Sequence, residues 1–130
     1  MRFMSKKKLL ITGAAGDIGT ILLKNLPLDE YDLVLADIRE SELTNQHPFI
    51  KLDISNLEAF TAACEGVHTV IHMAADRRTF APWETLLPAN VIGCYNAFEA
   101  AHQAGCKRVI YASSINAMSG NPRDIQLGPN

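Results

Sequence analysis

The stretch LLITGAAGDIG at residues 9–19 decides the fold. Its apolar start is typical of a buried parallel strand, three glycines spaced three apart follow, and the next residues have helical character. A strand, a glycine turn and a helix in this order indicate a nucleotide site. Gly13 permits the tight turn, Gly16 lets the backbone approach a diphosphate, and Gly19 lets the helix lie close to the strand. The amino end of that helix would then face the phosphates.

An acidic residue follows at the distance that a dinucleotide site requires. Asp37 lies 18 residues after Gly19, at the end of a second apolar run, where a carboxylate would meet the ribose hydroxyls. Three glycines alone also occur in plain structural turns, so Asp37 is the residue that favours a dinucleotide. A phosphate loop of the nucleoside triphosphatase kind is excluded, because no lysine follows Gly19.

Composition limits the remaining classes. The chain has 130 residues, of which 48% are hydrophobic and 20% charged, as expected of one globular domain. A net charge of -2 provides no attraction for nucleic acid or anionic lipid, and no apolar run approaches the ~20 residues of a membrane span. Without an apolar signal core at its start, the sequence predicts a cytoplasmic protein. Its three cysteines and four histidines have no metal-ligand spacing, so no metal is expected.

Strands and helices alternate along the chain. Ser55 and Glu58 have the spacing of a capping box, which predicts a helix start there, and Pro88 is compatible with the long third helix only in its first turn. Cys94, Tyr95 and Phe98 form an apolar stripe that we expect in the core. The predicted helices cover residues 17–26, 55–66 and, from near residue 83 or 85, the chain up to 104. The predicted strands after the first cover residues 32–37, 49–53 and 109–112, and residues 67–75 contain a fourth buried run, 70–73.

Five strands alternating with helices predict a mostly parallel, doubly wound α/β sheet with helices on both faces. Ligands of such sheets bind beyond the carboxyl ends of the strands, where the strand order reverses. Each strand of this chain ends at a candidate residue or segment, and these are Gly13, Asp37, Asp53, Met73 to Ala75, and Ser113 with Ser114. His72 lies in the fourth apolar run, where it is expected to pack rather than to act as a base.

Five segments match one family in the right order. They are TGAAGDIG at residues 12–19, LDI at 52–54, HMAA at 72–75, NVIG at 90–93 with the EAA that follows at 99–101, and YASS at 111–114. With these segments the chain resembles the extended short-chain dehydrogenase/reductases, which include sugar-nucleotide epimerases and dehydratases. Pro82, Trp83 and Asn116 resemble the uronate dehydrogenase branch. The resemblance implies a Rossmann-type sheet whose NAD-binding N-terminal part, about five strands, is residues 1–130, without the later strands and the substrate region.

The resemblance also implies roles for single residues. Asp53 would hydrogen-bond the adenine amino group, Asn90 would steady the active site, and Ser114, the expected catalytic residue, would hold a substrate hydroxyl near the nicotinamide. Arg77 and Asn116 are the expected substrate-binding residues, although Arg77 and Arg78 also suit a solvated loop. The expected cofactor-binding residues are Gly13, Gly16, Asp17, Ile18, Gly19, Asp37, Ile38, Arg39, Asp53, Ile54, Met73, Ala74, Ala75, Asn90 and Ser113.

The choice of coenzyme depends on Asp37. Its carboxylate would accept hydrogen bonds from the ribose hydroxyls of NAD but would repel the 2′-phosphate of NADP. Two like charges ~4 Å apart repel by roughly 4 kcal/mol at an effective dielectric constant near 20. Arg39 could accommodate that phosphate, yet the sequence predicts NAD, with NADP as the weaker candidate.

The acid/base pair of the family is absent from these residues. The family uses Tyr-x-x-x-Lys beyond the serine, but only 16 residues follow Ser114, and none of Tyr31, Tyr95 and Tyr111 has a lysine four positions later. Met118 stands near the place of the tyrosine that epimerases carry after the serine. We therefore expect the N-terminal half of a longer enzyme or a short relative without catalysis, and Pro129-Asn130, which reads as a loop, favours truncation.

Two functions remain open at this point. The first is an NAD-dependent oxidoreductase or epimerase that acts on a sugar or sugar acid by hydride transfer and could form a homodimer. The alternative is a non-catalytic dinucleotide-sensing module. A Tyr-x-x-x-Lys sequence shortly after Asn130 would favour the enzyme.

Overall fold

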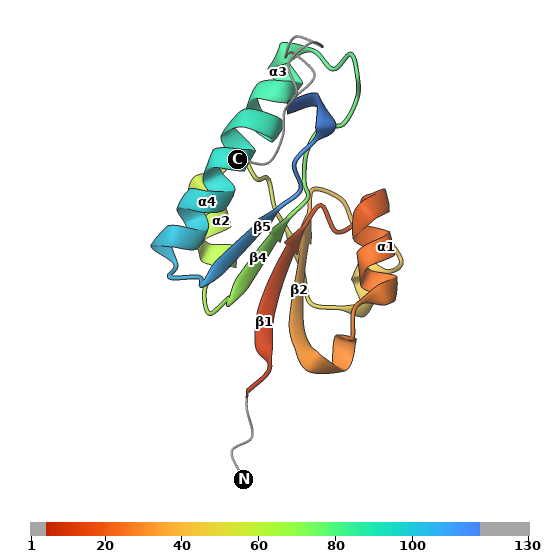
Figure 1. Ribbon diagram of the computed structural model, residues 1–130, viewed down its shortest axis with the longest axis vertical. Coiled ribbons are helices and arrows are strands. Elements are labelled where there is room, and N and C mark those ends of the chain that lie inside the picture. The colour runs from red at the N-terminus through yellow and green to blue at the C-terminus, as the bar shows by residue number, and fades with distance from the viewer. Residues whose placement is uncertain (1–4, 118–130) are drawn as a thin grey trace, which may run out of the picture.

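Five parallel strands form a single sheet in the order β3-β2-β1-β4-β5 (Figure 1). The computed structural model describes residues 5–117, so the expectations for Met118 and for Pro129-Asn130 lie outside the described residues. The strand order reverses between β1 and β4, which places the ligand crevice of a doubly wound sheet beside β1. The strands are β1 (Lys7–Thr12), β2 (Tyr31–Asp37), β3 (Phe49–Lys51), β4 (Thr69–His72) and β5 (Arg108–Tyr111). The predicted doubly wound parallel sheet is confirmed.

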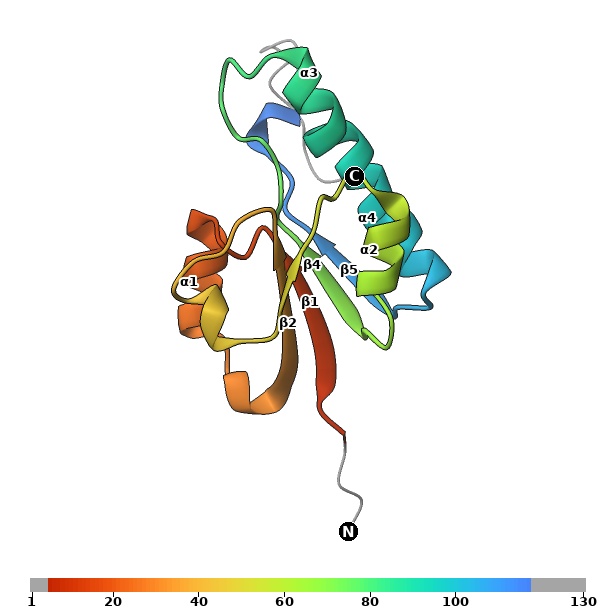
Figure 2. The same ribbon diagram turned by 180° about the vertical axis from the view of Figure 1, so that it is seen from behind.

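Helices cover both faces of the sheet (Figures 1 and 2). On one face α1 (Asp17–Asn25) buries Leu23 against Ile11 and Leu35 of the sheet. On the other face α2 (Leu57–Ala63) and α4 (Gly93–Gln103) enclose the larger core around Phe60 and Leu10. Short 3-10 turns are η1 (Leu28–Glu30), η2 (Thr44–Gln46) and η4 (Ile115–Ala117). Within residues 5–117, no helix combines the length and the apolar character that crossing a membrane requires.

The long predicted helix is present but changes its winding at Pro88. It begins as α3 (Trp83–Leu86), widens into the π-helical segment η3 (Leu87–Ile92) and continues as α4. Pro88 therefore lies beyond the first turn, contrary to our expectation. Proline has no N–H and crowds the carbonyl four residues earlier, and the wider turn accommodates both effects. The Gly93 N–H bonds to the Pro88 carbonyl, which is the i→i+5 bond of a π-helix.

The stripe that was expected to be core faces solvent instead. Tyr95 is 63% exposed, Phe98 is 47% exposed, and Cys94 is half-buried, so this prediction is wrong. The buried face of α4 carries small residues, because the helix packs closely on its neighbours. A Cβ at Gly93 would lie 2.5 Å from Ile54 Cδ1, and the buried Asn96 side chain donates a hydrogen bond to the Ile54 carbonyl over 2.9 Å.

The start of α2 also differs from the prediction. Asn56, not Ser55, caps the helix, with its Oδ1 accepting from the Ala59 N–H at 3.0 Å. The Ser55 hydroxyl donates to Asp53 Oδ1 at 2.7 Å instead. The capping-box prediction is therefore wrong by one residue, because the Ser55 hydroxyl donates its hydrogen bond to Asp53 and Asn56 caps the helix.

This difference yields a measurable expectation. Replacing Asn56 with alanine should lower the free energy of unfolding by about 1 kcal/mol, the usual cost of losing a helix cap. Ser55→Ala is the matched control and should cost clearly less, since its exposed hydrogen bond does not cap the helix. Urea unfolding of both variants checks this, and a larger loss in Ser55→Ala would restore the capping-box interpretation.

Candidate functional site

The glycine loop follows β1, beside which the strand order reverses, and touches the chain that follows β4. Gly13 has a φ of +70°, and a Cβ there would lie 2.7 Å from the Ala74 nitrogen. The Ala14 N–H donates to the Ala36 carbonyl of β2 at 3.3 Å. The loop is thus held between β2 and β4, at the carboxyl ends of the strands, where the sequence placed it.

The other two glycines differ in what surrounds them. A Cβ at Gly19 would lie 2.5 Å from the Gly13 carbonyl oxygen and 2.6 Å from that of Ala14, so packing within the protein requires this glycine. A Cβ at Gly16 would lie 3.2 Å from the Gly13 oxygen and, among residues 5–117, within 4 Å of no other atom beyond its chain neighbours, so the backbone is open there. That open cradle, which a Cβ would partly fill, fits a diphosphate approaching the backbone.

Asp37 stands at the end of β2, beside the glycine loop. Its Oδ2 accepts from the Ala15 N–H at 3.0 Å, and its Oδ1 accepts from the Arg39 N–H at 3.3 Å. The bond to Ala15 was not visible in the sequence, because it joins residues on neighbouring strand ends. It brings the predicted ribose-binding carboxylate next to the predicted diphosphate cradle.

The apolar cofactor candidates follow β1, β2 and β4, at the same end of the sheet as the glycine loop. Ile18 and Ile38 are exposed, at the start of α1 and just after β2. Met73 packs against the core on the α1 side, Ala74 packs against the core on the opposite face, and Ala75 is exposed. Exposed apolar side chains beside the cradle suit the flat apolar faces of a base.

Asp53 follows β3, the outermost strand on the β2 side, at the carboxyl end of the sheet. Its carboxylate accepts from the Ser55 hydroxyl at 2.7 Å and from the Ser55 N–H at 2.9 Å. These hydrogen bonds hold the pKa of Asp53 below its usual range. Ile54 beside it is buried, and its carbonyl is taken by Asn96.

A buried pair joins the ends of β1 and β4. Thr12 Oγ1 and His72 Nδ1 lie 2.7 Å apart, and the Ala74 N–H reaches the same hydroxyl at 3.4 Å. His72 is 1% exposed, and burial lowers its pKa to about 4, so the ring is neutral near pH 7. It packs between Phe60 and Tyr111, with ring centroids 5.8 and 5.9 Å away. The prediction of a packing histidine is confirmed.

The loop after β4 is anchored from the long helix. Asn90 Oδ1 accepts from the Asp76 N–H at 2.7 Å, and Asn90 Nδ2 donates to the Asp76 carbonyl at 2.8 Å. The Asp76 carboxylate in turn accepts from Arg78 Nε at 2.9 Å, and these bonds hold the pKa of Asp76 well below its usual range. Both amide atoms of Asn90 thus hold the backbone of this loop at Asp76, and the expected role of Asn90 in the active site stays a prediction.

Arg77 reaches across the site toward the first helix. Its Nη1 lies 2.6 Å from Asp17 Oδ2, while the two side chains are 78% and 70% exposed. The sequence suggested a separate role for each residue, and the structure brings them together at the amino end of α1. Their pairing joins residues 60 positions apart and could not be read from spacing.

The serines follow β5, at the same carboxyl end of the parallel strands as the glycine loop. Ser113 and Ser114 are exposed, and the Asn116 N–H donates to Ser114 Oγ at 3.2 Å in the turn η4. β4 lies between β5 and β1, so one strand separates the strand that leads to Ser114 from the strand that leads to the glycine loop.

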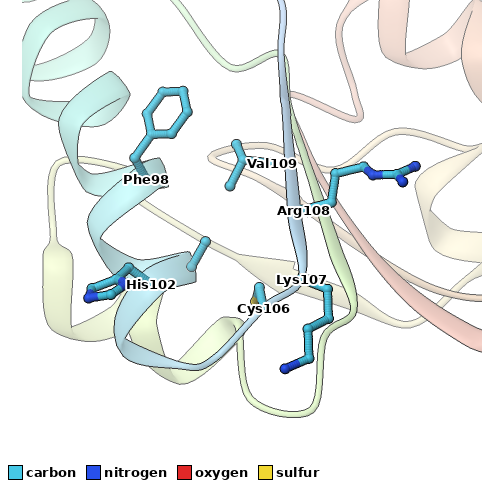
Figure 3. Close-up of a pocket in the computed structure, with 7 residues that line it drawn as sticks. Phe98, His102, Cys106, Lys107, Arg108 and Val109 are labelled. Carbon is cyan, nitrogen blue, oxygen red and sulfur yellow. The ribbon is translucent and has the colours of Figure 1, made fainter.

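A separate hollow lies at the other end of the sheet. It has a volume of about 340 Å³ and lies between α4 and the start of β5, as Figure 3 shows. Arg108 begins β5, whereas Ser114 follows the end of that strand, so this hollow is no part of the candidate site. Among residues 5–117, no group of histidine, cysteine and acidic side chains could hold a metal ion.

The sequence that forms this site matches a known family. A family model described as NAD dependent epimerase/dehydratase family matches residues 9–129. The chain belongs to this family. The resemblance inferred from the sequence is thereby confirmed, and the prediction of NAD as the coenzyme agrees with the NAD dependence that defines the family.

Individual members are similar over most of the chain. A uronate dehydrogenase from Agrobacterium fabrum is 32% identical over 124 residues, which are 95% of this chain and 46% of that protein. An L-arabinose 1-dehydrogenase (NAD(P)(+)) from Haloferax volcanii is 34% identical over 107 residues, or 82% of this chain and 41% of the relative. A crystal structure of a uronate dehydrogenase mutant from Agrobacterium tumefaciens complexed with NAD superposes with a TM-score of 0.74 and 32% identity. The match covers 85% of this chain and 42% of that one.

These relatives support the fold and the branch that the sequence suggested. The chain is similar to uronate dehydrogenases, and its five strands correspond to a Rossmann-type sheet. It spans less than half the length of the curated relatives described here.

Proposed function

We propose that this chain binds NAD and is the coenzyme-binding part of an NAD-dependent oxidoreductase or epimerase that acts on a sugar or sugar acid. The observation that carries the proposal is the open cradle at Gly16 with the Asp37 carboxylate joined to the same loop through Ala15. The similar proteins include dehydrogenases of uronate, L-arabinose and glucose 6-phosphate, which supports a sugar or sugar acid as substrate.

Each element of the crevice has a defined task in this proposal. The backbone N–H groups of the glycine loop and the amino end of α1 bind the diphosphate. The Asp37 carboxylate accepts hydrogen bonds from the ribose hydroxyls, and the Asp53 carboxylate accepts one from the adenine amino group. Bound NAD supplies the nicotinamide carbon that takes up a hydride. Ser114 positions the substrate hydroxyl, with Ser113 and Asn116 supporting that turn.

The acid/base pair lies outside these 130 residues in the proposal. None of the three tyrosines precedes a lysine at the required spacing, and the relatives are about twice as long as the matched segment. We therefore infer that residues 1–130 form the NAD-binding domain of a longer chain. The proposal includes a cytoplasmic location and allows a homodimer.

Binding of NADH tests the proposal directly. Titration followed by NADH fluorescence should give saturable binding, and Gly16→Ala should weaken it roughly tenfold, because the added Cβ enters the space of the diphosphate. The Gly13 oxygen, 3.2 Å from that Cβ, must shift slightly, so the thermal midpoint of the variant is measured as well to show that it stays folded. Unchanged NADH affinity in Gly16→Ala would contradict the proposed cradle.

The preference for NADH over NADPH tests the role of Asp37. Asp37→Ala should reduce that preference roughly tenfold or more, because the carboxylate that repels the 2′-phosphate is gone. Asp32→Ala is the matched control: it removes the same charge from the other end of β2, where Asp32 is exposed. Equal preferences in the two variants would show that Asp37 does not select the coenzyme.

The alternative is a non-catalytic dinucleotide-sensing module, which the absence of Tyr-x-x-x-Lys shortly after Asn130 would favour. NADH production from NAD should be followed with the full-length protein and glucuronate, L-arabinose or glucose 6-phosphate. Turnover with one of these substrates supports the enzyme, whereas saturable NADH binding without turnover supports the sensor.

A further inference from the structure

The loop after β4 presents two neighbouring arginines in different ways. Arg78 is fixed within the loop, because its Nε and Nη2 both bind the Asp76 carboxylate and its Nη2 also reaches Thr85 Oγ1 at 3.3 Å. Asp76 is itself clamped through its backbone by Asn90. Arg78 is therefore bound to its own loop, and Arg77 is the arginine that reaches the amino end of α1.

Arg77 has one ion pair, and that pair is weak. Its partner Asp17 directly follows Gly16, so the guanidinium stands next to the open cradle. Both side chains are more than two-thirds exposed, and exposed ion pairs contribute little to stability. A ligand with stronger negative charge can therefore exchange with the Asp17 carboxylate.

The diphosphate of a dinucleotide is such a ligand. It carries two negative charges, and its oxygens match the planar fork of an arginine, which binds phosphate through parallel hydrogen bonds. The Asp17 carboxylate has the opposite effect, because a like charge beside the diphosphate repels it. The pair thus combines one group that favours the bound anion and one that opposes it.

We propose that Arg77 is a latch for the coenzyme: it pairs with Asp17 in the free protein and moves to the diphosphate when the dinucleotide binds. The inference rests on the proposed function, since the anion is the diphosphate of NAD. It replaces the substrate contact that the sequence suggested for Arg77. The strand order supports this assignment, because Arg77 reaches to the β1 side of β4, whereas Ser114 follows β5 on the other side.

Three ligands separate the latch from other roles of Arg77. Isothermal titration with NADH, ADP-ribose and adenosine measures the affinity for each ligand. Arg77→Ala should lower the affinity for NADH and for ADP-ribose roughly tenfold and leave the affinity for adenosine unchanged. Asp17→Asn should strengthen NADH and ADP-ribose binding several-fold. Arg108→Ala is the matched control, since it removes an equal charge from an exposed residue at the amino end of β5.

The outcomes distinguish the latch from the proposed function. NADH affinity in Arg77→Ala equal to that in Arg108→Ala overturns the latch while leaving NAD binding intact. An equal loss for adenosine also overturns it, because that ligand has no phosphate. Failure of the unchanged protein to bind NADH overturns the proposed function and the latch together.

Discussion

Replacing Gly13 with alanine should lower the free energy of unfolding by about 3 kcal/mol. Gly13 has a φ of +70°, a region that costs an L residue roughly 1 kcal/mol or more. The new Cβ would also lie 2.7 Å from the Ala74 nitrogen and 2.8 Å from the Met73 carbonyl carbon. These are backbone atoms, which cannot rotate away as a side chain would. Urea unfolding measures the loss.

Gly66→Ala separates the two causes. Gly66 has nearly the same φ, +69°, but among residues 5–117 no atom beyond its own residue and its two chain neighbours lies within 4 Å of the position of its Cβ. This variant should lose only about 1 kcal/mol, the cost of the backbone conformation alone. Equal losses in the two variants would mean that the chain after β4 yields to the new methyl group and does not restrict the glycine loop.

The arrangement of the sheet was predictable because its signals are local. Short apolar runs separated by glycine, proline and helical segments specify parallel strands with crossover helices, and the structure has all five strands. The glycines between β1 and α1, together with Asp37 at the end of the neighbouring strand, also predicted where in the sheet a ligand would bind. The fourth buried run, expected at residues 70–73, is the strand Thr69–His72, and the residues after it lie against Gly13 of the glycine loop.

The face of α4 was not predictable from periodicity. Apolar residues lie on both sides of this helix, so a helical period alone does not say which side is buried. Close packing against α2 and Ile54 selects the side with Gly93, Ala97 and Ala100, and this leaves Tyr95 and Phe98 outside. The decisive quantity is the distance between elements, which a single sequence does not contain.

The side-chain contacts within the site could not be predicted from the sequence either, for a different reason. Thr12 with His72, Asp17 with Arg77 and Asp76 with Asn90 are pairs that the fold creates between distant residues. The sequence identified most of these residues by their place at strand ends or by family resemblance. It did not show that Arg77 and Asn90 act through specific partners.

The second large effect concerns pH and His72. Burial lowers the pKa of His72 to about 4, below the usual 6.5, so the folded protein keeps the ring neutral. Between these two values the unfolded chain binds a proton that the folded protein does not. The free energy of unfolding should therefore fall as the pH falls from about 6.5 to about 4, by at most about 3 kcal/mol, and this group should have no effect above that range. Urea unfolding at a series of pH values measures the slope.

Two variants show whether His72 causes that slope. His72→Gln keeps a polar group near Thr12 Oγ1 but cannot take up a proton, so most of the slope between pH 4 and 6.5 should disappear even if the variant is less stable throughout. His102→Gln removes an exposed histidine from α4 and should leave the slope in place. If the slope persists in His72→Gln, another group must be protonated on unfolding, and the ring buried between Phe60 and Tyr111 does not limit the stability of this fold in acid.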